Sequence, residues 1–392
     1  MKYIVVIILF FFSLSAAKAE IYKSLAKALK NPLKVDSLDL SFQELTLVPK
    51  EVFRFKKLVY LDLSYNKLTS LPLELWKLFN LNYLDISGNQ LTVLPSEIGN
   101  LVNLIELEVN NNQLTVLPKE IGKLVNLTSL SVSGEFTGLS SEIWSLDNLT
   151  SLSINDGLTI LPPEIGKLVN LTSLNLAYNQ LSVLPTEIGQ LQKLEEFDLK
   201  FNQLSVLPAE MAQLQKLEKL SLQSNQLTIL PSEIGSLSKL DYLKLSFNEL
   251  KSVPLELANL RNCYIEFSGN PDLWINPSFL NQLRKNNNKV YYSYPFLKSW
   301  CAQYFWNQNE RFIYQVDVAV KNESQYFLKN IWVNIIVKDS KGNQQYNKNH
   351  GININLNAGE QQNYEVELTS PIYYFKQDPY KYKIEVEITD AQ

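Results

Sequence analysis

The chain has 392 residues, of which 45% are hydrophobic and 19% are charged, and its formal net charge at pH 7 is −4. This length is typical of about two domains, and the apolar fraction is high enough for a buried core, which excludes a disordered chain. The slightly acidic balance provides no basic surface for nucleic acid, so we expect no nucleic-acid partner.

The first nineteen residues have the pattern of a secretory signal peptide. Lys2 supplies a positive charge, the run from Ile4 to Phe12 is uninterrupted and apolar, and Ala17 and Ala19 form a small-x-small cleavage site. The run is shorter than the roughly 20 residues that a membrane-spanning helix needs, and no later stretch is long enough. We predict cleavage after Ala19 and a secreted, periplasmic or cell-surface protein. The alternative is an uncleaved anchor.

Residues 20–34 have the features of a helical N-terminal cap. Ile21, Leu25 and Leu29 form an apolar stripe at helical spacing, and Pro32 ends it. A cap is needed because the first turn of a repeat structure exposes apolar core.

Residues 35–274 repeat one pattern with a period of 23 residues. The repeat at Leu171 reads LTSLNLAYNQLSVLPTEIGQLQK, and the repeat at Leu194 reads LEEFDLKFNQLSVLPAEMAQLQK. A period of about 20 to 29 residues with this leucine spacing predicts a leucine-rich-repeat solenoid. We expect an α/β fold, a right-handed solenoid with a parallel sheet on its concave side. It has ten full repeats and a partial one that begins at Cys263.

The residues that recur in every regular repeat predict its structural framework. Alternation in the strand turns Leu174 and Leu176 inward. Asparagines at one offset should bond the backbone of adjacent turns; they are Asn66, Asn89, Asn112, Asn179, Asn202, Asn225 and Asn248. Two repeats, 127–148 and 149–170, have 22 residues and lack this asparagine, which indicates either sequence drift or a local kink.

The variable strand positions should face the concave side and form columns, which makes them the candidate binding surface. Exposed aromatic rings are good contact anchors, and a row of carboxylates favours a basic partner. Alternatively, aspartate at this position belongs to the framework. The predicted contact residues are Tyr60, Asp62, Tyr65, Tyr83, Asp85, Glu106, Glu108, Tyr178, Phe201, Tyr242 and Phe247.

Residues 275–307 form a predicted junction, with a helix at Pro277 to Lys285 followed by an aromatic-rich run. Cys263 precedes this junction, and Cys301 lies within it. In an exported protein they could form a disulfide, or both could be buried thiols.

Residues 308–392 change to a period of two. Phe312, Tyr314 and Val316 alternate with other side chains, and so do Ile384, Val386 and Ile388. Several such strands joined by Gly- and Asn-containing turns predict a small all-β sandwich of the immunoglobulin-like kind.

The sequence offers no catalytic constellation, so we expect no enzyme activity, no cofactor and no metal. Its single histidine, His350, cannot build a multi-histidine metal site, and no phosphate-binding loop occurs. Asn126, Asn148, Asn170 and Asn322 match the glycosylation sequon, to which we assign no role.

The repeats resemble those of exported bacterial leucine-rich-repeat proteins with the unit N-x-L-x-x-L-P-x-E-I-G-x-L. The C-terminal part resembles small immunoglobulin-like domains of the FxLYD kind at Val320-Lys-Asn322-Glu-Ser324, Asp339-Ser-Lys-Gly342 and Leu356-Asn-Ala-Gly359-Glu360. The resemblance implies protein–protein recognition, in adhesion or in contact with a host or other partner. The alternative is a carbohydrate-binding surface protein that stacks sugars on the concave-face aromatics.

Overall fold

The computed structural model describes residues 21–136, 139–273, 275 and 277–291, together with strands at 297–307, 312–322, 328–338, 344–356, 361–373 and 383–391. The predicted signal peptide therefore lies outside the described residues. The chain divides into two compact units, Met1–Gly157 and Leu158–Gln392.

The first unit begins with a cap that is only partly helical. Helix α1 spans Leu25–Ala28, which is shorter than the predicted stripe, and Pro32 opens a separate 3-10 helix, η1, Pro32–Lys34. Before α1, Tyr22 forms a parallel bridge with Leu38, so the segment also extends the edge of the sheet. The cap thus covers the first repeat with backbone hydrogen bonds as well as with the buried Ala28.

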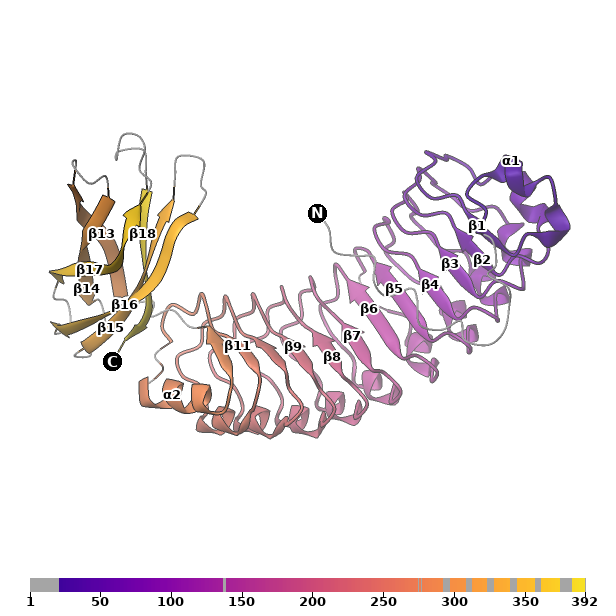
Figure 1. Ribbon diagram of the computed structural model, residues 1–392. Helices are drawn as coiled ribbons and strands as arrows, with labels where there is room; N and C mark the ends of the chain where they lie inside the picture. The colour runs from indigo at the N-terminus through magenta and orange to yellow at the C-terminus, as the bar shows by residue number, and fades with distance from the viewer. Residues whose placement is uncertain are drawn as a thin grey trace. The chain divides into compact units, whose positions relative to one another are not determined.

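Six short strands follow in the first unit, and each pairs in parallel with the next (Figure 1). Residues one repeat apart are in register, as Tyr60 is with Tyr83, so each repeat position becomes a column across the sheet. The central leucines, such as Leu61 and Leu84, are fully buried, and each such side chain contributes about 1.5–3 kcal/mol. The strands are β1 Ser37–Asp39, β2 Tyr60–Asp62, β3 Tyr83–Asp85, β4 Glu106–Glu108, β5 Ser129–Ser133 and β6 Ser151–Asn155.

The predicted asparagine ladder is confirmed. The Asn66 Nδ2 donates to the carbonyl oxygens of Leu40 and Leu63, both at 2.9 Å, and its Oδ1 accepts from the backbone N–H of Gln43 and Leu45 at 3.0 and 2.9 Å. One side chain therefore satisfies backbone groups of two successive repeats that no strand pairs.

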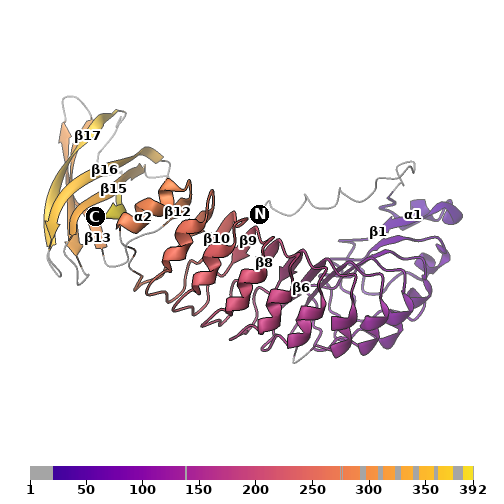
Figure 2. The same cartoon turned by 90° about the horizontal axis from the view of Figure 1, so that it is seen from below.

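The opposite side of each repeat is a 3-10 helix. It starts after the repeat's proline, whose fixed φ suits this turn, except that Ser140 precedes the helix at Ser141–Ser145. Consecutive helices lie side by side (Figure 2). In the first unit these are η2 Lys50–Arg54, η3 Leu75–Lys77, η4 Ser96–Asn100, η5 Lys119–Lys123 and η6 Ser141–Ser145.

A second asparagine column, which the sequence analysis did not recognise, lies at the loop between helix and strand. The Nδ2 groups of Asn103, Asn126 and Asn148 donate to the carbonyl oxygens of Phe79, Val102 and Val125 in the preceding repeat, at 2.8, 2.9 and 2.7 Å. Asn126 and Asn148, noted above as sequons, therefore have a framework role.

The two 22-residue repeats carry longer strands. β5 and β6 have five residues each, and their pairing extends to Val132 with Ile154 and Ser133 with Asn155. Without the ladder asparagine the chain continues as a strand where the other repeats turn. The turn that follows needs Gly157, whose φ is +122° and whose added Cβ would lie 2.7 Å from the Phe136 nitrogen.

The second unit continues the same architecture. Its parallel strands are β7 Ser173–Asn175, β8 Glu196–Asp198, β9 Lys219–Ser221, β10 Tyr242–Lys244, β11 Tyr264–Glu266 and β12 Lys289–Tyr291. Its helices are η7 Pro163–Lys167, η8 Thr186–Gln190, η9 Ala209–Gln213, η10 Ser232–Ser236, η11 Leu255–Asn259 and α2 Pro277–Lys285. Strand β12, within the predicted junction, pairs with β11 and adds a further rung to the sheet.

Cys263 lies in the last repeat and is fully buried, and it forms no disulfide with another described cysteine side chain. Burial raises the pKa of its thiol to about 12, so the thiolate that would react is scarce near neutral pH. The side chain of Cys301 lies outside the described residues, and the pairing of the two cysteines stays a prediction.

The C-terminal strands form two antiparallel three-stranded sheets, with orders β13-β14-β17 and β16-β15-β18. They are β13 Leu297–Asn307, β14 Phe312–Asn322, β15 Leu328–Lys338, β16 Gln344–Leu356, β17 Gln361–Tyr373 and β18 Lys383–Ala391. β13 pairs with β14 although it precedes residue 308, where the sequence analysis begins the β domain. The immunoglobulin-like assignment stays a prediction.

Candidate binding surface

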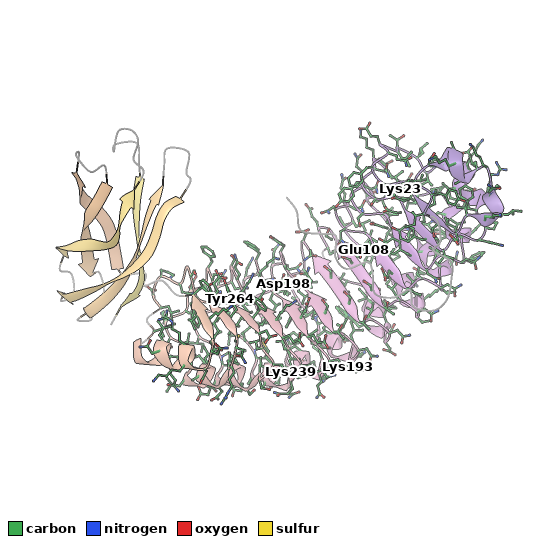
Figure 3. All side chains as sticks on the ribbon, viewed as in Figure 1. Lys23, Glu108, Lys193, Asp198, Lys239 and Tyr264 are labelled. Carbon is green, nitrogen blue, oxygen red and sulfur yellow. The ribbon has the colours of Figure 1, made fainter. Side chains whose placement is uncertain are left out.

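The predicted contact residues of the first unit, together with Asp39 and Phe42 at the equivalent positions of the first repeat, form three neighbouring sets on its sheet. The acidic column consists of Asp39, Asp62, Asp85 and Glu108, in register on β1 to β4. The tyrosine pair, Tyr60 and Tyr83, lies two residues earlier on the same strands, with Glu106 next in that register. The turn aromatics, Phe42 and Tyr65, follow the strand ends. Glu108 lies on the strand side of the repeats in Figure 3.

The acidic column concentrates negative charge, because neighbouring strands are only about 4.8 Å apart. Burial, and then the charge of Asp85, raises the pKa of Glu108 to about 7. Burial also raises the pKa values of Asp62, Asp85 and Glu106. Asp39 pairs with Lys23 at 3.6 Å, but among the residues that the structure describes no lysine or arginine forms an ion pair with Asp62, Asp85, Glu106 or Glu108. A cation beside them would therefore be stabilised.

The aspartates also have a framework role. The Oδ1 of Asp62 accepts from the backbone N–H and hydroxyl of Ser64 at 2.8 and 2.6 Å, and the Oδ1 of Asp85 accepts from the N–H of Ser87 at 2.8 Å. These bonds close the turn after each aspartate's own strand. The Oδ1 of each carboxylate thus serves the fold, as the alternative interpretation of the sequence anticipated. The Ser64 hydroxyl also bonds the Asp85 carboxylate, and among the described residues no cation pairs with the Oδ2 of either aspartate.

Glu108 ends the column in a polar cluster. Its Oε2 accepts from Asn110 Nδ2 at 3.0 Å, and the same amide donates to the Ser131 hydroxyl at 2.6 Å. The Asn110 Oδ1 is buried without a hydrogen-bond partner among the described residues. The hydrogen bonds from this cluster favour the ionised form of Glu108, but burial and the neighbouring carboxylates outweigh them, so its pKa is raised.

The tyrosine pair is stacked. The ring centroids of Tyr60 and Tyr83 are 4.4 Å apart with an interplanar angle of 8°, and both side chains are half-buried. Burial, with the neighbouring carboxylates Asp62 and Asp85, raises both pKa values above that of an ordinary phenol. The hydroxyls stay protonated and can donate hydrogen bonds.

The turn aromatics occupy a backbone conformation that such residues seldom adopt. The φ angles of Phe42 and Tyr65 are +55° and +51°, whereas the same repeat position holds Gly88 at +63° and Asn111 at +53°. A left-handed φ costs a non-glycine residue about 1–2 kcal/mol. Phe42 and Tyr65 are nevertheless 71% and 50% exposed. The fold accepts glycine or asparagine here, so it does not itself require the rings.

These two rings also stack, with centroids 4.5 Å apart and an interplanar angle of 6°. The other side of the Tyr65 ring lies against Gly88, where an added Cβ would be 2.8 Å from a ring carbon. Both faces of Tyr65 are therefore occupied by the protein itself.

The second unit presents a sheet face of mixed charge. Asp198, in the acidic register, pairs with Lys200 at 3.0 Å, and Glu196 pairs with Lys219 at 2.6 Å. Tyr178 stacks on Phe201 with centroids 4.7 Å apart. In Figure 3 Asp198 and Tyr264 lie on the strand side, whereas Lys193 and Lys239 lie on the helix side.

The structure adds two tyrosines to the predicted set in this unit. Tyr264 lies between Tyr242 and Tyr291, with centroid distances of 5.7 and 4.8 Å. Tyr264 occupies the same strand position as Tyr242, so repeat alignment could have identified it. Tyr291 lies on β12, outside the repeat pattern. Phe247, also predicted, lies against Gly269 as Tyr65 lies against Gly88.

Within the described part of the chain, no group of three or more His, Cys, Asp or Glu side chains could hold a metal ion. No helix among the described residues is long and apolar enough to cross a membrane.

Parallel strands, an asparagine ladder and a 23-residue period define a leucine-rich-repeat protein. The leucine-rich repeat region family matches residues 34–161 and 162–290. Because these matches cover more than half of the chain, the protein belongs to this family. Proteins of this fold are typically binding scaffolds.

Solved structures give the same result. A leucine-rich-repeat protein of Leptospira interrogans is 41% identical with a TM-score of 0.65, and the match covers 70% of each chain. A plant peptide hormone receptor, RGFR1 in complex with RGF2, is 30% identical with a TM-score of 0.55, and the match covers 67% of this chain and 47% of the receptor. No curated protein matches.

An internalin of Listeria monocytogenes shares the fold, with 20% identity and a TM-score of 0.53 over 70% of this chain and 85% of the internalin. The first two structures link the chain to the family by sequence as well as by shape, whereas this one shows the fold alone.

Proposed function

We propose that the protein is an exported recognition module that binds another protein through the sheet face of its first unit, at Tyr60, Asp62, Tyr65, Tyr83, Asp85, Glu106 and Glu108. The observation that carries this proposal is the set of exposed rings at left-handed turn positions, beside carboxylates with no ion pair among the described residues. A basic partner would stabilise the carboxylates, and the exposed rings would gain contact area on it.

The partner is basic on the side that meets this surface. Asp62, Asp85, Glu106 and Glu108 all have raised pKa values, so each would be stabilised by a neighbouring positive charge. Attraction of this kind speeds association and weakens as salt screens it. Export rests on the pattern of residues 1–19. The plant peptide hormone receptor RGFR1, in complex with RGF2, is an example of a repeat protein that binds a peptide.

The carbohydrate alternative is less well supported by the ring geometry. A sugar stacks on an aromatic face, but Tyr60 and Tyr83 cover one face of each other. Phe42 and Gly88 occupy both faces of Tyr65. These rings mainly present their edges and hydroxyls, which suit a protein surface better than a pyranose ring.

A pull-down with residues 20–392 as bait, against cell-surface and host extracts, tests the proposal. The captured protein should bind less tightly to a Tyr60→Ala, Tyr65→Ala, Tyr83→Ala variant and more weakly at high salt. A Val93→Ala, Val116→Ala variant is the matched control, because both valines are more than half exposed and lie outside the strands. Unchanged binding by a folded triple tyrosine variant would refute the proposal.

A further inference from the structure

We propose that the partner inserts basic side chains at two places on the first unit, against the Oδ2 atoms of Asp62 and Asp85 and beside the rings of Phe42 and Tyr65. The inference rests on the proposed function and specifies the partner chemistry. It comes from a comparison between the two units, because the second unit fills the equivalent place with a side chain of its own.

The internal example is Lys200. Its ammonium pairs with Asp198 Oδ2 at 3.0 Å and lies over the Tyr178 ring, 5.7 Å from the centroid. The Asp198 Oδ1 accepts from the Lys200 backbone N–H at 3.1 Å. One oxygen thus closes the turn while the other holds a cation next to the turn aromatic of the preceding repeat.

Asp39 shows the same division of its two oxygens. Its Oδ1 accepts from the Ser41 backbone N–H at 3.0 Å, and its Oδ2 pairs with Lys23 at 3.6 Å. The chain therefore supplies a cation to Oδ2 at Asp39 in the first unit and at Asp198 in the second unit.

Asp62 and Asp85 have every part of this arrangement except the cation. Their Oδ1 atoms close the turn with Ser64 and Ser87. The turn aromatics of the preceding repeats are Phe42 and Tyr65, at the repeat position of Tyr178. However, the residue two places after each aspartate, which is Lys200 in the second unit, is a serine here. A serine cannot reach Oδ2 with a positive charge, and the described residues provide no other ion pair.

Lysine and arginine both have the positive charge and the alkyl stem that fit beside Asp62 and Asp85. Both bring a positive charge to a carboxylate and an alkyl stem to an aromatic ring. Arginine can also pair in a bidentate way and stack, so the two are separated by experiment. Two such places on adjacent strands, about 4.8 Å apart, require a partner with closely spaced basic residues.

The test is to install the missing cation. Residues 20–392 with Ser64→Lys and Ser87→Lys should bind fluorescent octalysine and octaarginine peptides about tenfold more weakly than the wild type, because the new lysines occupy Oδ2. Thr186→Lys with Ser232→Lys, two exposed positions on the helix side of the second unit, adds the same charge as a control. Fluorescence anisotropy measures each affinity, and circular dichroism checks the fold.

A reciprocal variant keeps the test decisive if the buried serines do not accept lysine. Lys200→Ser frees Asp198 Oδ2 and Tyr178, and should increase peptide binding about twofold. A preference for octaarginine over octalysine assigns the inserted residue as arginine. Equal weakening by the serine variant and the control, or no gain with Lys200→Ser, would overturn the inference but leave the aromatic contact surface standing. Loss of partner binding on removing the tyrosines is scored separately, so the two failures are distinguishable.

Discussion

Replacement of Glu108 by glutamine should change the stability of the protein increasingly as the pH rises from about 4.5 to about 7, with the full effect above that range. The folded protein raises the pKa of Glu108 from 4.5 to about 7, first through burial and then through the charges of Asp85 and Glu106. A raised pKa means that the folded state binds this proton more tightly than the unfolded state. The stability linked to Glu108 is therefore complete below pH 4.5 and lost as the pH rises to about 7.

The size of the effect follows from the shift. At about 1.36 kcal/mol for each pKa unit, moving from 4.5 to about 7 corresponds to about 3 kcal/mol as an upper limit. Glutamine has the same shape and can still accept from Asn110, but it carries no charge. Glu108→Gln should thus leave the free energy of unfolding nearly unchanged at about pH 4.5 and increase it by up to about 3 kcal/mol at about pH 8.

Urea denaturation at several pH values between about 4.5 and about 8.5 measures this difference. Glu120→Gln on the 3-10 helix η5 is the matched control, because it removes the same charge on the opposite side of the repeat. This control should leave the free energy of unfolding nearly unchanged across the pH range. A Glu108→Gln effect of equal size at both ends of the range would show that packing, and not charge, determines it. Stabilisation confined to low pH would contradict the sign of the argument.

Three further predictions concern the framework and the cysteines. Asn89→Ala removes the hydrogen bonds to the Leu68 N–H and to the Leu63 and Ile86 carbonyl oxygens, and should lower the free energy of unfolding in urea by about 3–5 kcal/mol. Asn103→Ala removes one exposed hydrogen bond and should lower it by less than about 1 kcal/mol. Equal losses would refute the difference between the two asparagine columns. Gly157→Ala should destabilise by more than about 2 kcal/mol, because of its φ of +122° and the close Phe136 nitrogen; a neutral result in the same assay would show that this turn relaxes. In a Cys301→Ser variant, Cys263 should resist iodoacetamide until urea is added, because the thiol is buried and its pKa is raised to about 12. Labelling of the native variant within minutes would contradict this. For the wild type, thiol titration in urea without reductant distinguishes free thiols from a Cys263–Cys301 disulfide.

The repeat period was enough to predict the parallel sheet and the residues that share a column. A 23-residue period in a parallel sheet brings the same position of each repeat together, so the sequence alone pairs Tyr60 with Tyr83. The second asparagine column was equally available, since Asn80, Asn103 and Asn126 recur at the same spacing. It was missed because exposed asparagines in loops are common and their partners are backbone groups.

The chemistry of the surface was harder to predict. The amino-acid sequence does not show that Tyr65 adopts the left-handed φ that Gly88 adopts one repeat later. Which oxygen of Asp62 accepts the turn hydrogen bond also depends on the geometry of the turn at Ser64, where the N–H donates to Oδ1. The five-residue strands β5 and β6 arise from a deletion whose effect on hydrogen bonding is three-dimensional. The period therefore predicts which residues are neighbours, and the backbone conformation determines what each of them can bind.

Amide hydrogen exchange of residues 20–392, with and without the captured partner, tests the central claim most directly. The proposal predicts that binding slows exchange in β2, β3 and β4 and in the turns that follow them, at residues 60–66, 83–89 and 106–112. The 3-10 helices η3, η4 and η5 of the same repeats should be unaffected. Slower exchange confined to those helices, or to the C-terminal strands β13 to β18, would contradict the claim that the sheet face of the first unit is the binding surface.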